Sequence, residues 1–169
     1  MNDNILIMKH VSFAISLNCN LRCKLCGAYA PYYSNNKFPD IVIIKERLHN
    51  FFKLVDYVEW LSISGGEPLL YHKLPQVLSE LQHYFNKIGK LEIVTNGTIV
   101  PSNDLLNTVV SFKKVNFYFF VDNYGKKIST KIDEISAKLK EFQIPFKVRD
   151  YYSENKHCGG WVDYSLLKE

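Results

Sequence analysis

Five short hydrophobic runs alternate with segments of helical periodicity along the 169-residue chain, and this alternation most limits the possible fold. The predicted strands cover residues 11–17, 57–64, 91–95, 115–121 and 146–150, and the helical stripes lie within residues 44–55, 74–88, 102–112 and 128–142. Strict alternation predicts an α/β fold with a parallel sheet and crossover helices. The hydrophobic fourth run indicates a sheet covered on both faces. An open doubly wound sheet and a partial (β/α) barrel both fit this pattern.

Polar or glycine-containing segments follow the predicted strands at their carboxyl ends. These segments are a cysteine-bearing loop (residues 17–40, the cysteine loop), Ser64–Pro68, Thr95–Gly97, Asp122–Gly125 and Arg149–Tyr151. The carboxyl ends of parallel strands meet at one edge of the sheet, where α/β proteins bind their ligands. The sequence therefore predicts a single functional site at that edge.

Three of the four cysteines fall within eight residues, as Cys19, Cys23 and Cys26 with C-x3-C-x2-C spacing. Three thiolates on a short loop can hold three irons of a cubane cluster and leave the fourth iron open to an exogenous ligand. Zinc with His157 or Cys158 as fourth ligand is the alternative, and three unligated thiols are another. The uneven triplet favours the cluster, because zinc sites usually carry two paired C-x2-C units.

The cysteine triplet after one strand, followed by Gly65-Gly66-Glu67-Pro68 after the next, resembles the radical S-adenosylmethionine (radical SAM) superfamily over about residues 11–150. The resemblance implies a partial (β/α) barrel with five to six parallel strands and outer helices. It also implies a [4Fe-4S] cluster on the triplet and S-adenosylmethionine (SAM) on the open iron. Reductive cleavage of SAM would then give a 5′-deoxyadenosyl radical that abstracts hydrogen from an unknown substrate.

The resemblance assigns the SAM amine to residues 65–68, the glycine segment. Gly65 and Gly66 allow close backbone approach, and the Gly66 carbonyl and Glu67 carboxylate are expected to accept hydrogen bonds from the amine. Pro68 completes the motif. Without the cysteines, an ordinary strand–helix turn would account for this segment equally well.

Three further positions carry over from the family. Asn96 is expected near the ribose, although a simple left-handed turn explains it equally well. Asp122 falls where family members have a polar group after the fourth strand. Arg149 is placed to pair with the methionine carboxylate, or is a surface charge at a strand end. Candidates for stacking on the adenine are Tyr29, Tyr32 and Tyr33, and packing within the loop is the alternative role for these rings.

A single domain is predicted for residues 1–169, with its core at about 11–150 and a less regular tail at 151–169. Family cores usually have six strand–helix units, whereas five strands are convincing here. Cys158 in the tail resembles the start of a cysteine-rich extension. These features indicate a truncated chain.

Composition sets the remaining expectations. The hydrophobic fraction of 47% can form a core, and the formal charge of +4 without a dense basic block does not indicate nucleic-acid binding. No signal peptide or membrane span is apparent, so a cytoplasmic location is expected.

Expected partners are a small-molecule or peptide substrate and an electron donor such as flavodoxin or ferredoxin. The rival to a radical enzyme is a non-catalytic zinc or iron–sulfur module, and a weaker one is a simple electron carrier.

Overall fold

A computed structural model describes residues 5–23, 26–33, 37–112 and 114–150 of the chain. The described residues form one five-stranded sheet in which every neighbouring pair is parallel. The strands are β1 (Ile7–Ser16), β2 (Tyr57–Gly65), β3 (Ile88–Thr95), β4 (Asn116–Asn123) and β5 (Phe146–Asp150). Their spatial order follows the chain, β1-β2-β3-β4-β5.

Helices connect the successive strands. They are α1 (Ile41–Leu54), α2 (Leu74–Leu81), α3 (Asn103–Val110) and α4 (Ile132–Glu141), with 3-10 segments η1 (Ala30–Tyr32), η2 (Pro68–Leu70) and η3 (Gln82–Lys87). The polar side chains of Asp40 and Ser102 cap α1 and α3 by accepting hydrogen bonds from backbone N–H groups. Ser102 is thus the N-cap of α3.

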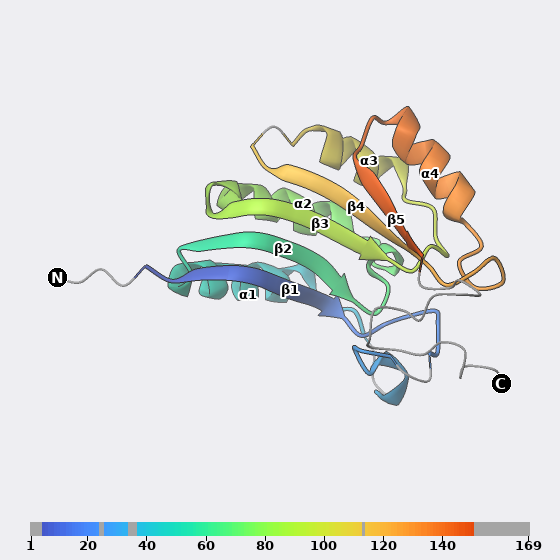
Figure 1. Ribbon diagram of the computed structural model, residues 1–169. Coiled ribbons are helices and arrows are strands. Elements are labelled where there is room, and N and C mark those ends of the chain that lie inside the picture. The colour runs from blue at the N-terminus through green and yellow to red at the C-terminus, as the bar shows by residue number, and fades with distance from the viewer. Residues whose placement is uncertain (1–4, 24–25, 34–36, 113, 151–169) are drawn as a thin grey trace.

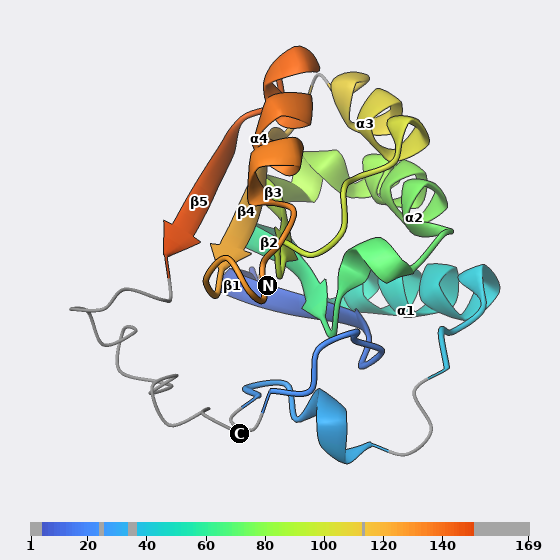
Figure 2. The same ribbon diagram turned by 90° about the vertical axis from the view of Figure 1, so that its right-hand side faces the viewer.

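All four helices lie on one face of the curved sheet (Figures 1 and 2). A consecutive strand order with crossovers of one hand places every connection on the same side. This arrangement confirms the partial (β/α) barrel and excludes the doubly wound sheet, which needs helices on both faces. The expectation of a sheet covered on both faces was wrong. Residues on the other face of β4, such as Phe120, are buried by neighbouring side chains.

Several strand and helix boundaries differ from the sequence predictions. β1 begins at Ile7 rather than Val11, because Ile7 already pairs with Tyr57 of β2. The second predicted helix stops early: α2 gives way to the 3-10 segment η3, and Ile88 begins β3 opposite Val58. Ile128 lies in the turn before α4 and is substantially exposed.

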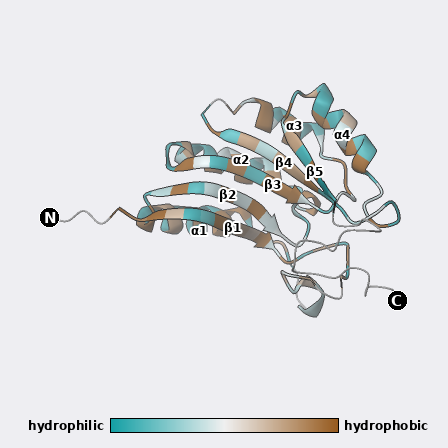
Figure 3. Ribbon diagram, viewed as in Figure 1, coloured by the Kyte–Doolittle hydropathy of each residue, from teal (hydrophilic) through white to brown (hydrophobic). Residues whose placement is uncertain are grey.

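The core lies between the sheet and the helices. Each helix presents hydrophobic residues to the sheet and polar residues outward, which Figure 3 shows as brown and teal sides of α4. Fully buried side chains come from every layer, including Leu48 of α1, Leu78 of α2 and Phe119 of β4. None of the helices in the described residues is long and apolar enough to cross a membrane.

Candidate functional site

The glycine segment is docked on the start of the cysteine loop by backbone hydrogen bonds. Gly66 N donates to Ser16 O at 2.8 Å, and Glu67 N donates to Asn18 O at 2.8 Å. Gly65 has a φ of 121°, and a Cβ on Gly65 or Gly66 would collide with the carbonyl oxygens of Ser16 or Asn18. Only glycine allows this approach. The two motifs of the sequence are therefore in direct contact.

Glu67 joins the ends of β2 and β3. Its Oε1 accepts from Leu69 N at 3.0 Å and Thr95 Oγ1 at 2.9 Å, and its Oε2 accepts from Asn96 N at 2.7 Å. Burial raises the pKa of Glu67 to about 7, although these hydrogen bonds favour the charged form. The expected contact of this carboxylate with a SAM amine has to compete with donors that already occupy both oxygens.

Asn96 links the β3 turn to the cysteine loop. Its Nδ2 lies 3.0 Å from Asn20 Oδ1 and 3.7 Å from Cys19 Sγ. Asn20 also donates to Thr98 Oγ1 at 2.8 Å. The side chain of Asn96 thus contacts the first cysteine of the triplet. The ribose contact of Asn96 that the family resemblance implies stays a prediction.

The three cysteine thiols are free and partly exposed. Burial raises the pKa values of the Cys19 and Cys23 thiols, and the nearby charge of Cys26 raises both further. The thiols therefore lie within electrostatic reach of one another. Within the described residues, no three His, Cys, Asp or Glu side chains are gathered closely enough to hold a metal ion.

Asp122 and Arg149 form an ion pair at the ends of β4 and β5. Arg149 Nε lies 2.7 Å from Asp122 Oδ1, and the two residues are in register across the sheet. Burial raises the pKa of Asp122, and the hydrogen bond and positive charge of Arg149 oppose this. The guanidinium also lies 4.7 Å from the Phe120 ring centroid. Arg149 is therefore a paired charge whose side chain remains 30% exposed.

Ser129 contributes to the site although no sequence pattern singles it out. Its buried Oγ lies 2.8 Å from Asn96 O and 3.0 Å from Asp122 O, and it accepts from Tyr124 N at 2.9 Å. It therefore fastens the β3 turn to the end of β4. A serine in a polar turn is too common to carry a signal.

Two series of contacts connect the carboxyl ends of β2 to β5 with the cysteine loop. One runs from Cys19 through Asn96 to Glu67. The other runs from Asn96 through Ser129 to Asp122 and Arg149. The structure therefore brings the predicted site residues together at one edge. The tyrosine rings are less connected: Tyr29, Tyr32 and Tyr33 are exposed, with 6.3 Å between the first two ring centroids. His157 and Cys158 lie outside the described residues.

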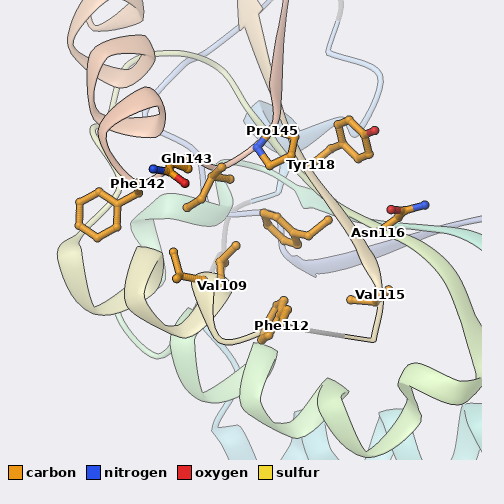
Figure 4. A pocket seen from close by; sticks show the side chains of 11 residues that line it. Val109, Phe112, Val115, Asn116, Tyr118, Phe142, Gln143 and Pro145 are labelled. Carbon is orange, nitrogen blue, oxygen red and sulfur yellow. The ribbon is translucent and has the colours of Figure 1, made fainter.

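A pocket of about 350 Å³ lies at the other end of the sheet. Figure 4 shows it between α3, the start of β4 and the segment after α4, lined by residues such as Val109, Phe112 and Pro145. Most of its lining residues are hydrophobic in type, and none of the predicted site residues contributes to it. The pocket is therefore separate from the candidate site.

Known proteins with similar sequences are GTP 3′,8-cyclases. The enzyme of Helicobacter pylori is 26% identical over 148 residues, which are 84% of this chain and 44% of that protein. The probable GTP 3′,8-cyclase of Methanococcus aeolicus is 30% identical over 94 residues, 55% of this chain and 31% of that protein. The chain thus spans less than half the length of these relatives. No family model matches it.

Solved structures with the same fold contain bound SAM. The structure of anSMEcpe with SAM has a TM-score of 0.63 at 19% identity, covering 84% of this chain and 43% of that one. Streptococcus suis SuiB bound to SAM has a TM-score of 0.55 at 16% identity, covering 95% of this chain and 44% of that one. These similarities agree with the sequence relatives.

In sequence and in fold the chain is similar to radical SAM core domains. The radical SAM resemblance drawn from the two motifs is thereby confirmed, and so is the partial barrel with parallel strands. Five strands are present in the described residues. The contact between the cysteine loop and the glycine segment lies at the edge where the domain is expected to bind its cofactors.

Proposed function

We propose that this radical SAM domain binds a [4Fe-4S] cluster through Cys19, Cys23 and Cys26 and cleaves SAM reductively. The observation that carries the proposal is the pair of backbone hydrogen bonds that docks the glycine segment on the cysteine loop. This contact holds the expected SAM amine site against the expected cluster site. When bound, the cluster would supply the electron that cleaves the sulfonium C–S bond of SAM. The products would be methionine and a 5′-deoxyadenosyl radical.

The residues present fit such a cluster by their donor chemistry. Three partly exposed thiols on one loop suit iron. The role of the protein is to fix the loop. Asn96 contacts Cys19, and the backbone of Gly66 and Glu67 holds residues 16–18 immediately before it.

The glycine segment, Gly65 to Pro68, is proposed to receive the SAM amine. Because the Glu67 carboxylate accepts three hydrogen bonds within the protein, the Gly66 carbonyl is the better acceptor for the amine. Glu67 then acts by holding the turn that presents this carbonyl. Pro68, which is buried, begins η2 and keeps the turn in place.

Arg149 is proposed to hold the SAM carboxylate, with Asp122 keeping the guanidinium in position until SAM binds. The Asp122 carboxylate is the acceptor that the ligand must replace or share.

Arg149→Lys keeps the positive charge but loses the planar guanidinium fork, so SAM affinity should fall about tenfold. Equilibrium binding to the reconstituted protein measures this, and Lys147→Arg on the same strand is the control.

Anaerobic reconstitution with iron, sulfide and a reductant tests the proposal. We expect brown absorbance, about four irons per chain, and 5′-deoxyadenosine once SAM and reductant are added. Cys23→Ser should abolish both signals, whereas Cys158→Ser should leave them unchanged. Zinc in place of iron, or metal loss in Cys158→Ser, would instead support the non-catalytic metal module. A complete cluster without 5′-deoxyadenosine would refute radical chemistry.

The wider assignments are proposals of the same kind. We propose a single domain over residues 1–169, with a tail at 151–169, and a cytoplasmic enzyme that takes electrons from a flavodoxin or ferredoxin. Its substrate is a small molecule or a peptide. Both classes occur among similar proteins, as GTP 3′,8-cyclases and as anSMEcpe with a bound Cp18Cys peptide.

A further inference from the structure

Three exposed tyrosines of the cysteine loop have no task in the cofactor roles proposed above. Tyr29, Tyr32 and Tyr33 are 64%, 68% and 55% exposed, so packing within the loop covers less than half of each residue. The rings of Tyr29 and Tyr32 lie close together. Tyrosine is enriched at protein interfaces, because its ring is apolar and its hydroxyl stays hydrated or hydrogen-bonded. A group of exposed tyrosines is therefore typical of a docking surface.

The backbone fixes these tyrosines beside the third cysteine. Tyr29 N donates to Cys26 O at 2.9 Å, and Tyr32 N donates to Tyr29 O at 3.0 Å. Ala30 is 2% exposed, so η1 is anchored through this small residue while its tyrosines remain in solvent. Figures 1 and 2 show η1 projecting beyond the carboxyl edge of the sheet. A protein that binds to η1 would lie next to the expected cluster.

Two basic side chains flank the tyrosines, and the five residues together are called the tyrosine surface (Arg22, Tyr29, Tyr32, Tyr33 and Lys37). Arg22 is exposed and its Nη2 donates to Pro31 O at 3.4 Å, in the middle of η1. Lys37 is exposed and follows Tyr33 by four positions, so their Cα atoms are at most about 14 Å apart.

The acidic charge of the cysteine loop is already paired. Asp40 is the single acidic residue among residues 17–40, and it lies at the end of the loop. Its carboxylate caps α1 by accepting from Val42 N at 2.9 Å and lies 3.6 Å from Lys73 Nζ. The tyrosine surface is therefore positively charged, and the partner that complements it is acidic.

We propose that the tyrosine surface docks an acidic one-electron carrier protein. The inference rests on the proposed function, because a carrier must dock there only if the cysteines hold a cluster. With a flavodoxin, the fully reduced anionic flavin loses one electron, the cluster gains it, and no proton moves. Opposite charges speed such an encounter, and interfaces of electron-transfer proteins are small and transient. Five exposed side chains on one loop suit an interface of that size.

Isothermal titration calorimetry of the reconstituted protein with oxidised flavodoxin tests the docking without any turnover. Lys37→Glu should weaken binding about fivefold at low ionic strength, and Tyr32→Ser about tenfold. The matched controls are Lys53→Glu and Leu54→Ser, at exposed positions in the last turn of α1, which should bind as the parent does. Raising the ionic strength should weaken binding more in the parent than in Lys37→Glu.

Reduction by dithionite, which needs no docking surface, shows in each variant whether a reducible cluster is assembled. Failure of that reduction in the parent refutes the proposed function, whereas the calorimetric titration judges the docking by itself. Equal flavodoxin affinity in the parent, Lys37→Glu and Tyr32→Ser overturns the docking proposal. Equally tight binding of cytochrome c, a basic redox protein, also overturns it. Loss of SAM affinity in Tyr32→Ser with unchanged flavodoxin binding would assign the ring to the adenine instead.

Discussion

Glu67 shows how a motif residue acquires a second role from its surroundings. Its carboxylate is 1% exposed and holds the end of β2 against the β3 turn through three hydrogen bonds. Burial outweighs these bonds and raises the pKa of Glu67 to about 7, with a further contribution from the negative charge of Asp122. The charge state of this residue therefore depends on pH near neutrality.

The raised pKa of Glu67 predicts a pH-dependent stability of the cofactor-free chain. The folded chain keeps the Glu67 proton above the ordinary pKa of 4.5, whereas the unfolded chain releases it. The contribution to the unfolding free energy is therefore complete below pH 4.5 and is lost as the pH rises to 7, by about 3 kcal/mol. Urea unfolding across this range measures the change.

Glu67→Gln should remove this pH slope, because glutamine does not titrate, although the variant will be less stable throughout. Glu141→Gln on the exposed side of α4 should keep the slope of the parent chain. Equal slopes in the parent and Glu67→Gln would show that Glu67 is not the titrating group.

Gly66 and Gly27 provide a matched pair for the contact between the two motifs. A Cβ on Gly66 would strike Asn18 O, whereas a Cβ on Gly27 would meet nothing within 4 Å. We expect Gly66→Ala to displace the cysteine loop and to reduce the iron bound after reconstitution severalfold, while Gly27→Ala retains it. Equal iron contents in the two variants would mean that the loop forms the cluster site without the glycine segment.

At the scale of elements, each helix is fixed by its ends as well as by its hydrophobic face. Ser102 accepts from Leu105 N at 3.2 Å at the start of α3. The periodic stripe around Leu78 predicted α2 correctly but not its end. The chain leaves α-helical geometry at η3 because Ile88 is needed for pairing with β2.

Ser102→Ala should lower the unfolding free energy by about 1 kcal/mol, because the first turn of α3 loses its capping acceptor. Chemical denaturation measures the loss, and Ser102→Thr, which keeps the hydroxyl, should recover most of it. A fully stable Ser102→Ala protein would indicate that water replaces the cap at no cost.

At the scale of the whole molecule, one core joins the sheet to all four helices. Leu78 is fully buried between α2 and the sheet, whereas Leu54 at the end of α1 is 74% exposed. Leu78→Ala should cost about 2–5 kcal/mol and Leu54→Ala less than about 0.5 kcal/mol. Urea unfolding followed by circular dichroism and by fluorescence should give coincident transitions for both variants. Separate transitions would mean that α2 unfolds independently of the sheet.

Local patterns in the sequence determined the elements and the candidate site residues. The period at which hydrophobic residues recur shows which side chains of a strand or helix face the core. The five strands and the helical stripes around Leu48, Leu78 and Leu139 were therefore predictable. The cysteine spacing and the glycine segment were equally local. Because all strands are parallel, the position of these motifs after strands was enough to predict that they meet.

Only the tertiary structure decided which strands are neighbours, which face the helices cover and which partner each polar side chain has. Periodicity says that a residue is buried but not against what, so β4 was expected between two helical layers. Glu67 accepts a hydrogen bond from β3, Ser129 links the β3 turn to the end of β4, and hydrogen bonds connect His10 to Glu92 through a serine of β2. These bonds join residues that are 28 to 52 positions apart or that lie in irregular turns. Hydrogen bonds over such separations depend on strand order and register, which no local pattern encodes.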